Sequence, residues 1–262
     1  MSRRNSLLIE EQPTRKRTRA SKVISKSPNL SVVKKEKFTN QDSYGISEFK
    51  PSIYQQECLE VIEQNKITFV DSYAGTGKTS IALYYACREY LTDLRKKIIF
   101  VRTPAEMGGD KIGFLPGEAN LTDKLGPHFE STKSLIIDFI GKNKFEADLD
   151  KRIFFTIPNF ALGHTREDCI YIIDESQLLQ PLILKLLLER IGSYTKTIVL
   201  GSSGQLYADD KQNRNALRDA LNRFFDEDGY SKYDNIAYYK FPIEAVMRDD
   251  VVKDVIRAYD ND

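Results

Sequence analysis

The apolar positions of the chain fall into short runs separated by longer segments in which apolar residues recur at helical spacing. Short runs bounded by polar turns predict buried strands, and they occupy residues 67–70, 96–104, 153–158, 169–177, 197–201 and 235–241. Helical patterns are interspersed with them, at residues 53–62, 81–86, 129–140, 178–191, 213–226 and 249–259. Strands that alternate with helices predict an α/β fold with a mostly parallel sheet.

Two segments fit neither pattern. Residues 1–48 are rich in Arg, Lys, Ser, Asn and Gln without a sustained period, which predicts a disordered basic tail ahead of one ordered domain at residues 49–262. Residues 105–127 contain five glycines and two prolines, which predicts a long irregular insertion. Insertions of that length in compact domains are usually functional.

The first predicted strand runs into a glycine turn and a helix, in the sequence KITFVDSYAGTGKTS of residues 66–80. A strand, a glycine turn and a helix in this order are the context that a phosphate-binding loop requires. The start of a helix leaves backbone N–H groups unpaired and carries partial positive charge, so an anion is stabilised there. In such a loop Lys78 reaches the β- and γ-phosphates and the Thr79 hydroxyl can ligate Mg²⁺. The alternative is a chance glycine turn, which the Gly-Lys-Thr sequence after a strand disfavours.

One position of this loop departs from the pattern G-x-x-x-x-G-K-[ST], because Ser72 stands where the pattern has glycine. Serine can begin the same turn if its φ stays negative, so we expect an intact loop of slightly different shape. The residues expected around the phosphates are Ser72, Tyr73, Ala74, Gly75, Thr76, Gly77, Lys78, Thr79 and Ser80.

A second motif, CIYIIDESQ at residues 169–177, places two carboxylates where a central parallel strand would end. Ligands of open α/β sheets bind outside those strand ends. We expect Asp174 to hold Mg²⁺ in its outer shell and Glu175 to orient and deprotonate an attacking water. An exposed acidic turn is the alternative. The two motifs form one site if the ends of two neighbouring strands bring Lys78 and the acidic pair together over one triphosphate.

Gln55 has two compatible interpretations. Ser52 and Gln55 form the pattern S-x-x-Q of a capping box at the start of a helix. Because this helix leads into the phosphate loop, Gln55 could also hydrogen-bond the adenine edge of a bound nucleotide.

Composition narrows the functional classes. Hydrophobic residues at 41% and charged residues at 29% are ordinary globular values, and no apolar run approaches the length of a membrane helix. The N-terminus contains arginines without a following apolar core, so it is not expected to be a secretory signal. Cys58, Cys87 and Cys169 form no CxxC pair. This spacing indicates neither a zinc site nor a disulfide framework and fits a cytoplasmic location.

The net charge of +1 is unevenly distributed. Residues 1–50 contain 12 Lys or Arg against 5 Asp or Glu, whereas the other 212 residues contain 27 against 33. The basic clusters at residues 15–19 and 34–37 could neutralise nucleic-acid phosphates at low salt. A solubilising tail, or a linker to a partner, is the alternative.

Taken together and in order, the motifs resemble the PhoH-like (phosphate-starvation-inducible) ATPases, relatives of the superfamily-one helicases. The motifs are DSYAGTGKT, RTPAEMGGDKIGFLPGE, IIDESQ, LLERIG, VLGSSGQ and VMRDDVVKDVIRAY. KIGFLPG, at residues 111–117, is the most specific of them. The resemblance implies a RecA-like P-loop NTPase domain and Mg²⁺-dependent ATP hydrolysis. It also implies association with single-stranded RNA or DNA and assembly into homo-oligomeric rings such as hexamers.

The resemblance also implies roles for single residues. It matches Gln55 to adenine recognition, Gln177 to the last position of the acidic motif, and Gln205 to a glutamine that senses the γ-phosphate. Arg248 matches an arginine that could stabilise transition-state charge, and Arg190 is a second candidate. Surface ion pairs are the alternative for both arginines. In a single-domain ATPase such an arginine would normally reach the phosphate of a neighbouring subunit.

The chain differs from the family at Ser72, at Ser176, where alanine is usual, and at Ser202, where aspartate is expected. The missing carboxylate at position 202 could alter the coupling of hydrolysis to nucleic acid. We expect neither a second RecA-like domain nor a nuclease domain within this length.

Three functions are therefore compared. A helicase-like ATPase motor or remodeller that acts on nucleic acid is favoured, and a nucleotide-gated scaffold with slow turnover is kept open by Ser72 and Ser202. A small-molecule P-loop kinase would need an arginine-rich lid, and no arginine cluster follows the central strands.

Overall fold

A computed structural model describes residues 46, 48–103, 121–163, 165–204 and 215–260 of the chain. Apart from residues 46 and 48, the predicted basic tail lies outside the described residues. So do most of the predicted glycine-rich insertion, including KIGFLPG, and Gln205.

Parallel strands form one sheet in the order β3-β2-β4-β5-β1-β6. The strands are β1 (Ile67–Asp71), β2 (Lys97–Arg102), β3 (Ile153–Thr156), β4 (Cys169–Asp174), β5 (Lys196–Gly201) and β6 (Ile236–Lys240). All pairings between them are parallel. The predicted α/β fold is confirmed, and each predicted strand is present. β5 lies between β1 and β4, so the expectation that the two motif strands are neighbours is wrong.

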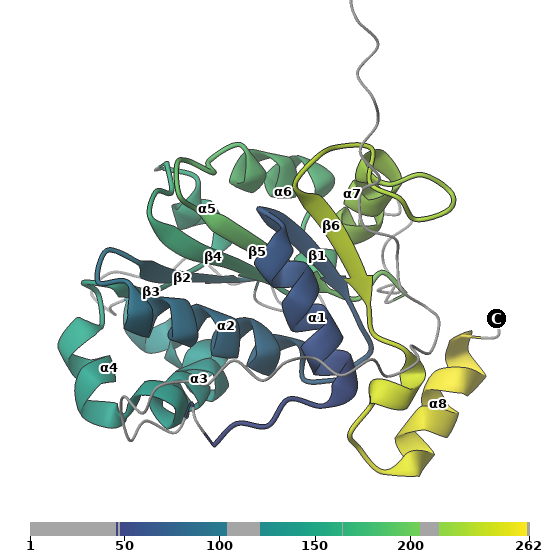
Figure 1. Cartoon of the computed structure of the whole chain (residues 1–262), viewed down its shortest axis with the longest axis horizontal. Helices are drawn as coiled ribbons and strands as arrows, with labels where there is room; N and C mark the ends of the chain where they lie inside the picture. The colour runs from purple at the N-terminus through teal and green to yellow at the C-terminus, as the bar shows by residue number, and fades with distance from the viewer. Residues whose placement is uncertain (1–45, 47, 104–120, 164, 205–214, 261–262) are drawn as a thin grey trace, which may run out of the picture.

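Helices cover both faces of the sheet, as Figure 1 shows. One face carries α1 (Ile53–Gln64), α2 (Lys78–Thr92), α3 (Leu121–Ile140) and α4 (Lys142–Asp148). The other carries α5 (Pro158–Ala161), α6 (Pro181–Leu188) and α7 (Ala216–Phe224). Two short 3₁₀ turns, η2 (Ser176–Leu178) and η3 (Ile243–Ala245), follow β4 and β6, and α8 (Asp250–Asp260) stands apart near the C-terminus.

The strands are buried on both faces, as parallel strands between helical layers usually are. Alternate side chains point to opposite faces. Phe100, Ile172 and Leu200 therefore pack under α1 to α4, whereas Val101 and Ile173 pack under α5 to α7. Every residue of β4 is buried. The centre of the sheet is therefore fully enclosed by the two helical layers.

The predictions for the segments between the strands need correction in three places. The helix expected at residues 178–191 is a 3₁₀ turn followed by α6, because Pro181 lacks an N–H and is favoured at the first position of a helix. The insertion expected to run to residue 127 ends before α3, which begins at Leu121. The short helices α4 and α5 were not predicted. None of the described helices is both long and apolar enough to cross a membrane.

Candidate functional site

The loop between β1 and α2 has the backbone that its sequence predicts. Gly75 and Gly77 have φ of 87° and 78°, in the left-handed region that glycine adopts most readily. Ser72 makes its part of the turn without a positive φ, and its N–H donates to the Gly201 carbonyl at 3.0 Å. Gly77 is the N-cap of α2 and provides no side-chain cap. The first N–H groups of α2 are therefore available to an anion.

Side chains from two distant segments lie against these glycines. A Cβ atom at Gly77 would come within 2.3 Å of Gln55 Nε2 and 2.9 Å of Met247 Cε. A Cβ atom at Gly75 would come within 2.8 Å of Arg248 Nε. The Met247 N–H also donates to the Gly75 carbonyl at 3.1 Å. The chain after β6 therefore covers the loop, and Arg248 lies on the loop of its own chain.

Gln55 makes both ends of the predicted capping box. Its N–H donates to Ser52 Oγ at 3.3 Å, and its Oε1 accepts from the Ser52 N–H at 3.0 Å. The buried side chain also donates from Nε2 to the Thr76 carbonyl at 3.3 Å. This second contact joins the start of α1 to the phosphate loop. It places Gln55, the residue expected to recognise adenine, against that loop.

The acidic pair follows β4 at the same edge of the sheet. The Asp174 side chain is 1% exposed, and its Oδ1 has no hydrogen-bond partner among the residues described. Glu175 adopts a left-handed conformation with φ of 55°. Such a backbone is strained for a non-glycine residue and is found disproportionately at functional sites. The guanidinium of Arg102, at the end of β2, lies 4.0 Å from Asp174 Oδ2 and 3.8 Å from Glu175 Oε1.

Gln177 connects Glu175 to the turn that follows β5. Its Nε2 donates to Glu175 Oε2 at 2.7 Å, and its Oε1 accepts from the Ser202 N–H at 3.2 Å. The Ser176 hydroxyl donates to the Leu200 carbonyl at 2.8 Å. Ser176 and Ser202, two of the residues at which the chain differs from the family pattern, therefore both form hydrogen bonds within the fold. Ser202 contributes its backbone N–H at a position where a carboxylate was expected.

Electrostatic interactions connect the acidic pair to the phosphate loop. Burial, together with the negative charge of Glu175, raises the pKa of Asp174 to about 6. The charges of Lys78 and Arg102 act in the opposite direction and lower this pKa in part. Lys78 and Asp174 thus act on one another across β5. Both motifs lie at the carboxyl edge of the sheet, on strands that β5 separates.

A buried carboxylate at the end of β1 anchors the turn after β5. Asp71 accepts hydrogen bonds from the Ser203 N–H at 2.8 Å, from the Ser203 hydroxyl at 2.5 Å and from the Tyr238 hydroxyl at 3.1 Å. Burial, with Asp71 next in importance, raises the pKa of Tyr238, so this hydroxyl keeps its proton. The turn after β5 is therefore held to the end of β1, the strand that precedes the phosphate loop.

Several polar atoms at this edge fit a phosphate and a hydrated divalent cation. Asp174 Oδ1, Ser72 Oγ and Thr103 Oγ1 are buried without a hydrogen-bond partner among the described residues. Buried polar atoms of folded proteins nearly always have partners. Thr79 and Ser80 lie in the first turn of α2, directly after the phosphate loop. A bound nucleotide with Mg²⁺ would supply the missing partners, and Thr79 and Asp174 are the residues of the expected kind to hold the metal.

The structure separates one predicted residue from this group. Arg190 is exposed, and its carbonyl accepts from the Arg166 N–H at 2.7 Å. Arg166 precedes β4, so Arg190 lies at the opposite end of the sheet from Asp174.

Sequence reasoning missed Arg102, Asp71 and Met247. Arg102 and Asp71 are charged residues that end buried strands at the edge where ligands bind, a signal that could have identified both. Met247 carries no such signal, because its contact with Gly77 arises only from the folded path of the chain after β6.

Comparisons with known proteins agree with these motifs. The family model described as PhoH-like protein matches residues 50–260. The PhoH-like protein of Bacillus subtilis (strain 168) is 30% identical over 207 residues, which are 79% of this chain and 62% of that protein. The PhoH-like protein of Synechocystis sp. is 28% identical over 207 residues, covering 79% of this chain and 60% of that protein. The matched region is thus about three fifths of the length of these relatives.

A solved structure gives a much weaker match. The Sulfolobus solfataricus SWI2/SNF2 ATPase core in complex with dsDNA aligns with a TM-score of 0.39 and 16% identity, over 68% of this chain and 36% of that one. No function is transferred from it.

Proposed function

Because the chain belongs to the PhoH-like protein family, we propose that it binds ATP with Mg²⁺ at the carboxyl edge of its sheet and hydrolyses it. The observation that carries this proposal is the buried Asp174. Its Oδ1 has no partner among the described residues, and its charge interacts with Lys78 of the glycine loop.

The roles follow from where the side chains lie. The first N–H groups of α2 and the Lys78 ammonium bind the phosphates. Thr79 and Asp174 would hold Mg²⁺, which would neutralise phosphate charge when bound. Glu175 accepts a proton from the attacking water. Gln177 positions Glu175 by its hydrogen bond at 2.7 Å.

Further residues complete the proposed site. Gln55 is proposed to read the adenine edge from its position against Gly77, and Gln205 to sense the γ-phosphate. Arg248 is proposed as the arginine that stabilises transition-state charge, supplied by the same chain because it lies against Gly75. Arg190 is not included, since it lies at the other end of the sheet.

The finer function that we propose is a helicase-like motor or remodeller that acts on single-stranded RNA or DNA. A nucleotide-gated scaffold with slow turnover is the second candidate. It is favoured by Ser202, which holds Gln177 through its N–H and has no carboxylate to offer the metal.

Phosphate release separates these candidates. It should be measured with ATP and Mg²⁺ alone, with single-stranded RNA and with single-stranded DNA. A motor releases phosphate faster with one of the strands, whereas a scaffold binds ATP with little turnover under all three conditions. Absence of both binding and turnover would remove the proposed function.

We also propose that the protein assembles into a homo-oligomeric ring. The support from the fold is α8, whose apolar residues Val251, Val255 and Tyr259 recur on one face and are 61%, 52% and 80% exposed. A helix with such an apolar face is stabilised by packing against another surface, and we propose that a second copy provides it. Replacing Val251 and Val255 with aspartate should reduce the mass measured by light scattering to that of a monomer.

A cytoplasmic location is proposed from the cysteines. Cys58, Cys87 and Cys169 are buried free thiols, and free thiols are typical of reducing compartments.

A further inference from the structure

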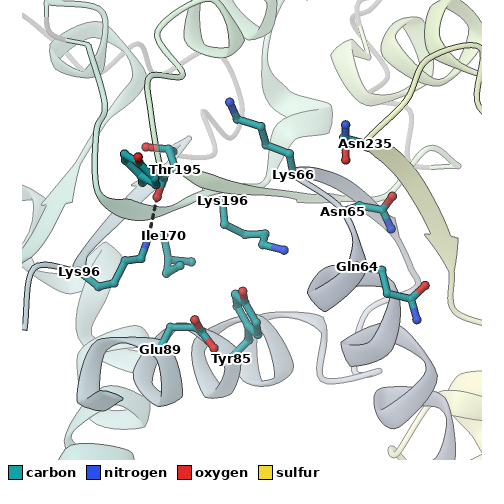
Figure 2. A pocket seen from close by; sticks show the side chains of 11 residues that line it. Gln64, Asn65, Lys66, Tyr85, Glu89, Lys96, Ile170, Thr195, Lys196 and Asn235 are labelled. Atoms are coloured by element: carbon teal, nitrogen blue, oxygen red, sulfur yellow. Dashed lines mark hydrogen bonds between the residues drawn. The ribbon is translucent and has the colours of Figure 1, made fainter. Parts of the chain in front are cut away.

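A cavity of about 420 Å³ opens at the amino ends of the strands, opposite the phosphate loop. It is lined by residues that precede or begin β1, β2, β4, β5 and β6 and by one side of α2, and Figure 2 shows it from close by. Its volume is within the range of small-molecule sites. The residues proposed to bind ATP at the phosphate loop do not line it.

Positive charge is concentrated in this cavity. Among the described residues, Lys66, Lys96 and Lys196 line it together with one carboxylate, that of Glu89. The lysines come from three different segments. Figure 2 shows Lys196 in the middle of the opening, with Lys96 to one side, and the Lys196 Nζ lies 5.6 Å from the centre of the Tyr85 ring.

The ammonium groups keep donors that the fold does not use. An ammonium group has three N–H donors. Lys196 Nζ donates to the carbonyls of Ile62 and Glu63 at 2.8 and 2.9 Å, and Lys96 Nζ donates to the Tyr194 carbonyl at 2.5 Å. Within the described residues the Lys66 ammonium has no hydrogen bond or ion pair. Donors therefore remain on all three lysines.

Structural hydrogen bonds account for part of the role of two of these lysines and for none of the third, Lys66. Lys196 caps the last carbonyls of α1, which is a stabilising position for a cation. Burial lowers the pKa of Lys196, while the charges of Glu89 and Glu63 act in the opposite direction and the charge of Lys96 adds to the lowering. Lys96 holds the Tyr194 carbonyl with one of its donors, whereas the Lys66 ammonium has no partner within the described residues. An anion in the cavity would compensate all three charges.

The backbone around the cavity is held in an unusual conformation. Tyr194 and Asn235, which both line it, have φ of 55° and 63°. Asparagine tolerates this region, but tyrosine rarely adopts it, and such strain is found disproportionately at binding sites. The conformation of Tyr194 presents its carbonyl to Lys96 and leaves its side chain 77% exposed. An exposed aromatic ring beside lysines is suited to a base next to a phosphate.

We propose that this cavity binds a phosphate group carried by a nucleotide or by a nucleic-acid strand. Lys66 and Lys96 contact the phosphate, Lys196 adds charge from its capping position, and the Tyr194 ring stacks on the adjoining base. This second site lies beyond the proposed ATPase and does not depend on it.

The test compares two double variants in a chain whose phosphate loop is disabled by Lys78→Ala. Lys66→Gln with Lys96→Gln removes two charges from the cavity. Lys142→Gln with Lys185→Gln removes two exposed charges from α4 and α6 and is the matched control. Lys196 is left intact because it caps α1. Equal melting temperatures of the two double variants show that the fold is retained.

Binding is measured by calorimetry with inorganic phosphate and AMP, and by fluorescence anisotropy with a labelled single-stranded oligonucleotide. The cavity variant should bind the preferred probe at least about tenfold more weakly than the control variant, because two phosphate contacts are lost. With the oligonucleotide, the slope of log K against log salt should fall by roughly 1.4. Tight binding of AMP identifies a free nucleotide as the source, and tight binding of the oligonucleotide alone identifies a strand.

Equal affinities of the cavity variant and the control variant would overturn the proposal, as would the absence of binding in both. ATP hydrolysis by chains with an intact Lys78 reports separately on the proposed function. Loss of hydrolysis with retained cavity binding would therefore remove only the ATPase proposal.

Discussion

The two ends of the sheet are formed by the same strands, but the site proposed at the carboxyl end and the cavity at the amino end are built in different ways. At the carboxyl end, Lys78 and Asp174 each belong to a short continuous motif, and their charges interact across β5. At the amino end, Lys66, Lys96 and Lys196 come from three separate segments, at or just before the starts of β1, β2 and β5. A continuous motif can be recognised in a sequence, whereas a site assembled from separate segments becomes visible only in the fold.

The two ends also differ in how their polar groups are satisfied. At the carboxyl end, Asp174 is buried with an oxygen that has no partner among the described residues, and Glu175 has a strained backbone. At the amino end, Lys96 and Lys196 donate to backbone carbonyls, and the backbone is again strained, at Tyr194 and Asn235. Local rules are typically violated at functional sites. Because the unpartnered buried carboxylate is found at the carboxyl end, we propose that this end carries the chemistry, and the following substitutions test the difference.

The largest effect on turnover is expected when two arginines, one at each end of the sheet, are replaced separately and compared. Arg248→Ala should lower turnover on the order of 10³-fold or more, because an arginine supplied in cis stabilises transition-state charge. Arg190→Ala, at the amino end, should leave turnover unchanged. Steady-state phosphate release and fluorescent-nucleotide binding are measured for both. Parallel loss of binding and turnover in Arg248→Ala would count against its role.

The next largest effect on turnover is expected when Glu175 and Glu189 are replaced separately and compared. Glu175→Gln should bind ATP normally and hydrolyse it roughly 10²- to 10⁴-fold more slowly, because the attacking water loses its base. Glu189→Gln removes an exposed carboxylate that pairs with Lys185 on α6 and should have no effect. Single-turnover hydrolysis at saturating ATP checks both variants. Undiminished turnover in Glu175→Gln would exclude this residue from the mechanism.

The burial of Asp174 predicts a stability that depends on pH. Its pKa rises from an ordinary 3.8 to about 6 in the folded chain, chiefly because of burial. A raised pKa means that the folded state holds the proton longer, so this contribution to stability is present below pH 3.8 and is lost as pH rises through about 6. Asparagine stays neutral. Asp174→Asn should therefore be more stable than wild type at pH 7, by on the order of 2 to 3 kcal/mol.

Chemical denaturation at pH 7 and at pH 3.5 measures this difference, which should disappear at the lower pH. The same variant should lose hydrolysis, since the neutral amide cannot replace the carboxylate at the metal. A variant that is less stable than wild type at pH 7 would contradict the expected cost of burying this charge.

The smallest effect, on the free energy of unfolding, is expected when Gly77 and Gly126 are replaced separately and compared. Gly77→Ala should lower the free energy of unfolding by about 1 to 2 kcal/mol, because φ of 78° disfavours a side chain and Gln55 occupies the space. It should also weaken nucleotide binding. Gly126→Ala lies in α3 with open space around it and should raise stability by roughly 0.5 to 1 kcal/mol. Thermal unfolding with and without nucleotide measures both, and equal responses would show that the loop does not need its glycine.

The sequence predicted the strands and the phosphate loop because each depends on consecutive residues. The capping box of Ser52 and Gln55 was predicted for the same reason. The contact of Gln55 with Thr76 was not, since it joins residues that only the fold brings together. The position of β5 between β1 and β4 also lay beyond local patterns, which do not encode strand order.

Arg102 shows where the sequence signal was present but incomplete. It ends an apolar strand at the ligand-binding edge, yet its closeness to Asp174 and Glu175 depends on the pairing of β2 with β4. The lysine cavity was not predicted, because Lys66, Lys96 and Lys196 stand at or just before the starts of three different strands and only the fold brings them to one cavity.

The most direct test of the account is a crystal structure of the chain with Mg²⁺ and a non-hydrolysable ATP analogue. The account predicts the β- and γ-phosphates on the Lys78 ammonium and the first N–H groups of α2, with Mg²⁺ between Thr79 and Asp174. A triphosphate bound only among Lys66, Lys96 and Lys196, with the glycine loop empty, would contradict it.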